Sequence, residues 1–138
     1  MEYDMRDFMK LCVDSYKKLA GVQQLRKVAT PFLAEPKHGP EEEGEGTLGK
    51  VACSVLMKVL YGARAARYDL LRPVQSLAKR VSTWTAQCDQ RLHRLMCYID
   101  SNTEAMQRGY VGNKIAECGL RLFADADFAG DSDAKSTS

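Results

Sequence analysis

The residues best suited to chemistry are aspartates near the end of the sequence. Asp125 follows an apolar segment, Asp127 stands two residues further on, and Asp131 and Asp133 come after Gly130. Residues two apart on a strand lie on the same side, and clustered carboxylates are the ligands that Mg²⁺ requires. Two such ions can activate water and stabilise the leaving oxygen in phosphodiester cleavage. The spacing alone favours the other interpretation, a polar turn rich in aspartate.

A second group of candidate ligands contains histidine and cysteine. His93 and Cys97 are four residues apart, so both could reach one metal ion from the same face of a helix. Cys88 lies five residues before His93 and points elsewhere, and no fourth ligand is evident. His38 stands alone in a Pro/Gly-rich segment. We therefore expect the cysteines to be small apolar residues rather than metal ligands or nucleophiles.

Residues 44–51 match most of a phosphate-binding loop, G-x-x-x-x-G-K. Val51 occupies the position of the Ser or Thr that would hold magnesium, and no strand precedes the loop. Nearby glutamates, including Glu43 and Glu45, would repel a triphosphate. We expect an acidic loop with a helix starting after Gly49.

Basic residues are concentrated between Arg64 and Arg94, where seven basic and two acidic residues give a net charge of +5. Such a face could hold a nucleic-acid backbone, but the spacing alone favours a solvated helix surface. Trp84 could stack on a base, but its apolar neighbours favour a place in the core. The seven basic residues are Arg64, Arg67, Arg72, Lys79, Arg80, Arg91 and Arg94.

Composition places these residues in one ordinary globular domain. The 138 residues are 45% hydrophobic and 28% charged, with a net charge of +2. The sequence has neither an apolar signal core near Met1 nor a run long enough to span a membrane, so we expect no secretion and no membrane partner. The five cysteines form no CxxC pair, which favours reduced thiols and a location in the cytoplasm or nucleus.

Four segments with helical periodicity must position these groups: residues 4–20, 50–66, 70–81 and 85–101. Gly21 is a plausible stop for the first helix, and Asp69 a candidate N-cap for the third. The second is apolar nearly all round, through Cys53, Met57 and Tyr61, which predicts a buried helix.

The end of the chain has a different pattern from the helical segments. Residues 105–111 and 119–124 have the pattern of strands separated by a Gly112-Asn113 turn. The predicted fold is mainly α, a four-helix bundle followed by one or two strands.

Several segments together resemble copia-type (Pseudoviridae) retrotransposon polyproteins. Residues 123–131 (FADADFAGD) followed by 135–138 (KSTS) are similar to the start of the family's ribonuclease H domain, which reads approximately SDADWAGD and then K/R-S-T-S-G. Upstream, residues 55–61 and 66–70 resemble its S/L-M-Y-L-A…T-R-P-D-I segment. Residues 91–99 resemble its K-R-I-L-R-Y-L helix, and 28–33 its threonine-proline segment.

The resemblance implies four regions and one site. Residues 1–34 would end the thumb-like region of a reverse transcriptase, 35–49 would be an acidic Pro/Gly-rich loop, 50–103 a helical connection region, and 104–138 a truncated start of a ribonuclease H-like α/β domain. Asp125 aligns with that family's first catalytic, metal-binding carboxylate, for Mg²⁺ in the intact parent domain. Asp127 and Asp131 match motif positions without an assigned role. The parent protein would act on RNA–DNA hybrids during retrotransposition, together with the rest of the polyprotein.

The sequence departs from the family's pattern at three places, and it also lacks acidic motifs on which activity depends. Phe128 replaces the usual Trp, Tyr68 replaces the Pro of T-R-P-D, and the loop over residues 35–49 is more acidic than usual. The Tyr-x-Asp-Asp pair of the polymerase and the later ribonuclease H carboxylates do not occur, so tight Mg²⁺ binding and activity of the chain alone are not expected. The alternatives are a non-enzymatic helical module that binds protein or RNA, and, less favoured, a nucleotide-binding protein that uses Lys50.

Overall fold

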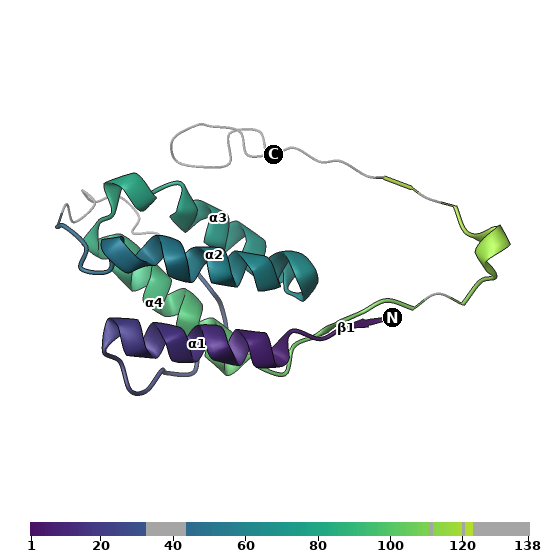
Figure 1. Ribbon diagram of the computed structural model, residues 1–138, viewed down its shortest axis with the longest axis horizontal. Helices are drawn as coiled ribbons and strands as arrows, with labels where there is room; N and C mark the ends of the chain where they lie inside the picture. The colour runs from purple at the N-terminus through teal and green to yellow at the C-terminus, as the bar shows by residue number, and fades with distance from the viewer. Residues whose placement is uncertain (33–43, 111, 120, 123–138) are drawn as a thin grey trace.

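A computed structural model describes residues 1–32, 44–110, 112–119 and 121–122. The fold of these residues is built mainly from α-helices. Within that part, α1 and α2 lie side by side and run in opposite directions, and α3 and α4 complete the bundle (Figure 1). The predicted mainly α architecture is therefore confirmed. The helices are α1 (Arg6–Ala20), α2 (Gly49–Ala66), α3 (Leu71–Ala78) and α4 (Ala86–Ser101).

The ends of α1 follow from local side-chain and backbone chemistry. Asp4 accepts hydrogen bonds from the Arg6 backbone N–H at 3.0 Å and from its guanidinium at 2.7 Å, so the chain turns into the helix two residues later than predicted. At the other end, Gly21 adopts the left-handed conformation with φ of 67° and donates to the Lys17 carbonyl, as the prediction of a glycine stop requires.

The hydrophobic core lies where the four helices meet. Helix α1 contributes Met9, Cys12, Val13 and Tyr16, whereas Leu19 near its end is 46% exposed. Gly62 of α2 lies against Met9 and Phe8, where any larger side chain would collide. The predicted place of Trp84 in the core is confirmed, and the buried residues of this part of the chain are Trp84, Cys88, Leu92, Leu95, Met96 and Ile99.

Helix α2 is buried on one face only, which corrects the prediction of a fully buried helix. Val55, Leu56 and Val59 pack into the core, but Met57 is 45% exposed and Tyr61 66% exposed. The prediction was wrong because a bundle of this size has no second layer to cover the opposite face of the helix.

Helix α3 begins through a short 3₁₀ turn, η1 (Tyr68–Leu70), and not through an aspartate cap. No side-chain cap bond is made at its start, and Asp69 binds Arg67 instead. Helix α4 does have a polar cap: Thr85 accepts from the Cys88 backbone N–H at 3.4 Å. A second 3₁₀ turn, η2 (Val81–Thr83), links α3 and α4.

The strands differ from the prediction. A two-residue strand, β2 (Gln107–Arg108), falls within residues 105–111, but its partner is β1 (Glu2–Tyr3), with Glu2 opposite Arg108. An ion pair of 3.1 Å between these two side chains supports the pairing. The described residues of the second predicted strand, 119, 121 and 122, are not in a strand, and a 3₁₀ turn, η3 (Ile115–Glu117), precedes them.

Among the described residues, none of the helices combines the length and the apolar character needed to cross a bilayer.

Candidate functional site

The aspartates of the predicted metal site, Asp125, Asp127 and Asp131, lie outside the described residues. Within residues 1–32, 44–110, 112–119 and 121–122, histidine, cysteine and acidic side chains do not gather in groups of three or more that could hold a metal ion. The chemistry that can be placed in the fold is therefore that of the helical bundle: an aspartate network, a histidine cluster and a set of arginines.

The aspartate network is centred on Asp89, in the first turn of α4. One carboxylate oxygen accepts from the Trp84 indole N–H at 2.6 Å and from the Leu48 backbone N–H at 3.1 Å. The other accepts from the backbone N–H and the hydroxyl of Thr47 at 2.6 and 2.8 Å. Burial by itself would raise the pKa of Asp89, but these donors outweigh it and hold the pKa below its ordinary value.

This network explains what the phosphate-loop pattern does in the fold. Helix α2 begins at Gly49, as expected, and the N–H groups just before it point at the carboxylate of Asp89. A helix N-terminus favours an anion, and here a side chain of the same chain is that anion. The loop before it is fixed as well, because Gly46 donates to the Trp84 carbonyl at 3.3 Å. The arrangement supports the acidic-loop interpretation over a nucleotide site.

His93 lies between Tyr16 and Cys97. Its Nδ1 is 2.9 Å from the Tyr16 hydroxyl and its Nε2 is 3.5 Å from the Cys97 sulfur. Burial lowers the pKa of His93, and the positive charge of Arg26 lowers it further. Burial also raises the pKa of Tyr16 to about 12. The cluster is thus built to keep a neutral imidazole in contact with a neutral phenol.

The third candidate ligand does not join this cluster. Cys88 is buried, and its sulfur is 3.4 Å from the Thr85 hydroxyl, which donates to it. The structure therefore brings His93 and Cys97 together but leaves Cys88 apart, as the spacing predicts. A cavity of about 430 Å³ lies beside His93, with Arg26, Gln90 and Asp89 also in its wall.

Of the seven basic residues predicted to face nucleic acid, Arg67 has a structural role. It is 3% exposed and holds Asp69 through two hydrogen bonds of 3.0 and 2.8 Å. It also donates to the Asn102 carbonyl at the end of α4 at 3.0 Å, and its guanidinium lies over the Tyr98 ring. Arg67 thus ties the end of α2 to the end of α4, and we leave it out of any nucleic-acid surface.

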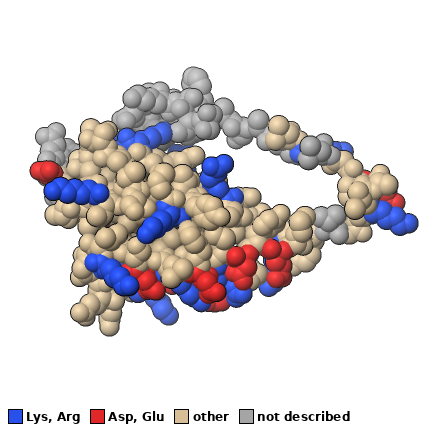
Figure 2. All heavy atoms as spheres, viewed as in Figure 1, with Lys and Arg blue, Asp and Glu red and all other residues tan. Residues whose placement is uncertain are grey.

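The other six basic residues are divided among different helices. Arg64 is exposed on α2 and Arg72 on α3, while Arg91 on α4 is partly buried. Arg94 donates to the carbonyl and hydroxyl of Thr30 at 2.8 and 3.0 Å, which attaches the residues before Pro31 to α4. Figure 2 shows isolated blue side chains on a mostly tan bundle face, rather than one continuous basic patch.

Two groups that organise the fold were not found from the sequence. Asp89 was not singled out in the sequence, yet it holds the start of α2 through contacts with residues 41 and 42 positions away in the chain. The contacts of Tyr98 with Arg67 and Asp69 were also missed, because Tyr98 lies 29 residues from Asp69 in the chain.

Comparisons with protein-family models, with curated proteins and with solved structures found no match to this chain.

Proposed function

We propose that this chain is a segment of a copia-type retrotransposon polyprotein, in which the helical bundle connects a reverse transcriptase to ribonuclease H. The observation that carries the proposal is the order of the segments: helices between Arg6 and Ser101 come before the Asp-Ala-Asp signature that begins at Asp125. A mainly helical connection region is what the resemblance implies, so the observed fold class supports it. The site of action would be the cytoplasm or nucleus.

In this proposal the bundle contacts the phosphate backbone of an RNA–DNA hybrid. The support is the excess of basic over acidic residues between Arg64 and Arg94, which remains when the buried Arg67 is left out, and Arg64 is exposed on α2. Contacts to phosphates are independent of sequence and release counterions, so affinity should fall steeply with salt.

The 138 residues are proposed to bind hybrid without cutting or copying it. They contain no Tyr-x-Asp-Asp sequence, and only Asp125 aligns with a metal-binding carboxylate of the family. Phosphodiester cleavage by a two-metal mechanism needs several such ligands to hold both ions.

The test is the anisotropy of a labelled RNA–DNA hybrid titrated with protein over a range of salt concentrations. Removing one phosphate contact should lower the slope of log affinity against log salt by about one, so Arg64→Gln and Arg91→Gln are each expected to do so. Lys18→Gln is the matched control, because Lys18 is an exposed lysine on α1 outside the basic stretch. No binding, or equal slopes for all three variants, would count against a nucleic-acid role.

A second candidate is a non-enzymatic helical interaction module. A specific observation favours it: α2 presents two large apolar side chains, Met57 and Tyr61, to solvent. A monomeric, cooperatively melting protein without affinity for hybrid would support this candidate over the first.

A further inference from the structure

We propose that Thr30 is a phosphorylation site for a proline-directed protein kinase, and that Arg94 of α4 receives the phosphate. This goes beyond the retrotransposon proposal and does not depend on hybrid binding. The modified group is the hydroxyl of Thr30, in the segment of residues 21–32 that follows α1.

The sequence at Thr30 is the one that a proline-directed kinase selects. The chain has four prolines, and only Pro31 follows a threonine or a serine. Proline has no backbone N–H and biases the residue before it toward extended backbone. A kinase that seats such a proline beside its catalytic centre would therefore select a single hydroxyl group in this chain.

The Thr30 hydroxyl lies where a kinase can reach it. Residues 22–32 are outside the helices and strands, and Thr30 is exposed. Near this point the segment is attached to α4 by hydrogen bonds, because the Val28 backbone N–H donates to the Ser101 hydroxyl at 3.0 Å and Arg94 donates to Thr30. Loops held by such surface hydrogen bonds open at low free energy. The segment can therefore enter a kinase cleft while the bundle stays folded.

Arg94 is already placed to bind a phosphate on Thr30. Its Nε–H donates to the Thr30 carbonyl at 2.8 Å, and its Nη2 donates to the Thr30 hydroxyl at 3.0 Å. A guanidinium has five N–H donors, and within the described part of the chain Arg94 forms no ion pair with a carboxylate. A phosphate on Oγ1 would therefore lie next to donors that suit it.

The surroundings of Thr30 are positively charged. Residues 15–32 include no acidic residue and four basic ones, Lys17, Lys18, Arg26 and Lys27. On α4, Arg91 lies one turn before Arg94, on the same side of the helix. The two acidic residues of α4 have other partners, since Asp89 caps α2 and Asp100 pairs with Lys17 at 3.6 Å. A phosphate group with a charge of about −2 would therefore be attracted to this place.

Phosphorylation would exchange one hydrogen bond of Thr30 for stronger ones. The kinase breaks the bond between the γ-phosphorus of ATP and the bridging oxygen that leaves with ADP, and a bond from that phosphorus to Thr30 Oγ1 forms. The hydroxyl proton passes to a carboxylate base of the kinase. The hydrogen bond of 3.3 Å from the hydroxyl to the Phe32 carbonyl is lost with that proton. Charge-assisted bonds from Arg94 replace it and fasten the segment more firmly to α4.

The first test asks whether Thr30 is modified. The folded full chain is incubated with a cyclin-dependent or mitogen-activated protein kinase and Mg-ATP, and mass spectrometry locates the phosphate. We expect one phosphate per chain, on Thr30, with incorporation kept in Thr30→Ser and lost in Pro31→Ala. Failure to modify the wild type, under conditions that fully phosphorylate a control Thr-Pro peptide, would overturn the proposal. Equal incorporation in Pro31→Ala would overturn it as well.

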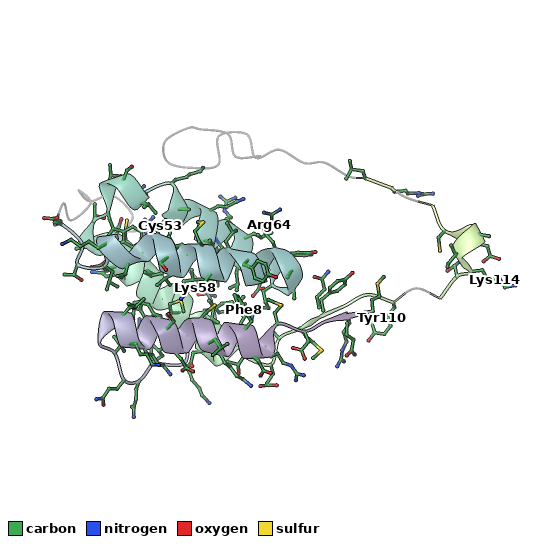
Figure 3. The ribbon with its side chains drawn as sticks, viewed as in Figure 1. Phe8, Cys53, Lys58, Arg64, Tyr110 and Lys114 are labelled. Atoms are coloured by element: carbon green, nitrogen blue, oxygen red, sulfur yellow. The ribbon has the colours of Figure 1, made fainter. Side chains whose placement is uncertain are left out.

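The second test asks whether Arg94 holds the phosphate. In a phosphorus NMR titration of the phosphorylated protein, we expect the second pKa of the phosphate to lie below its usual value of about 6 and to return toward that value in Arg94→Gln. Arg94→Lys keeps the positive charge and should give an intermediate value, which guards against a loss of fold. Arg64→Gln is the matched control, because Arg64 is exposed and projects from the side of α2 away from α1 (Figure 3). The same phosphate pKa in the wild type and Arg94→Gln would overturn the role of Arg94.

Discussion

The Asp89 carboxylate on α4 and the Leu48 backbone N–H before α2 form a hydrogen bond of 3.1 Å, so one helix caps the start of another. The same carboxylate accepts from Trp84 and from Thr47. The bond to Leu48 joins residues that are 41 apart in the chain. The glycine-rich segment that resembles a phosphate loop therefore has a structural role, which is to connect the start of α2 to α4.

Replacing Asp89 by alanine should therefore destabilise the bundle strongly. The change leaves the Trp84 indole and two backbone N–H groups without an acceptor, which typically costs about 2–4 kcal/mol. Asp89→Asn keeps one acceptor oxygen and should cost less. Urea unfolding followed by circular dichroism measures the difference. Asp14→Ala, at an exposed position on α1, is the control, and a comparable loss there would mean that the network is not the cause.

The pH dependence of stability should report on His93. Its pKa is lowered in the folded state by burial and by Arg26, so the unfolded chain takes up a proton first. The stability contributed by the neutral ring is complete above the ordinary histidine pKa of about 6.5 and is lost as the pH falls below that value. As the pH falls below about 6.5, the melting temperature of His93→Gln should therefore fall less than that of the wild type. If the melting temperatures of the variant and the wild type change with pH in the same way, His93 is not the group responsible.

Arg67 and Arg64 should respond very differently to the same substitution. Arg67→Lys breaks the paired hydrogen bonds to Asp69 and the bond to Asn102, with an expected loss of about 1–3 kcal/mol. Arg64→Lys, at an exposed position, should change the free energy of unfolding by no more than about 0.5 kcal/mol. Chemical denaturation of both variants makes the comparison. Equal losses would show that the contact between α2 and α4 is not important for stability.

Gly46 should not tolerate a side chain. A Cβ at this position would lie 2.5 Å from the Thr85 carbonyl oxygen and 2.8 Å from its carbonyl carbon. Because backbone atoms cannot move aside cheaply, Gly46→Ala is expected to cost about 1–3 kcal/mol. Gly109→Ala is the matched control, since nothing lies within 4 Å of its Cβ position. A thermal melt unchanged by Gly46→Ala would contradict this packing.

The helices could be predicted from the sequence because periodicity and local stops determine them. Gly21 ends α1, Thr85 caps α4, and the buried stripe around Leu92 follows the spacing. The start of α3 could not be predicted in the same way, since Asp69 has a better partner in Arg67 than in the helix end.

The features that were missed depend on contacts between distant residues. The pairing of β2 with Glu2 and Tyr3 joins the two ends of the described bundle. The exposure of Tyr61 depends on how many layers cover α2, which hydrophobic pattern alone does not give. Asp89 and His93 acquire their partners from other helices.

The proposal that this chain is a polyprotein segment which binds an RNA–DNA hybrid without cleaving it can be tested on the hybrid itself. The most direct test is a cleavage assay on a labelled hybrid with Mg²⁺ or Mn²⁺, using the wild type and Asp125→Asn. We predict that neither protein turns over the hybrid. Metal-dependent cleavage by the wild type that is lost in Asp125→Asn would contradict the account.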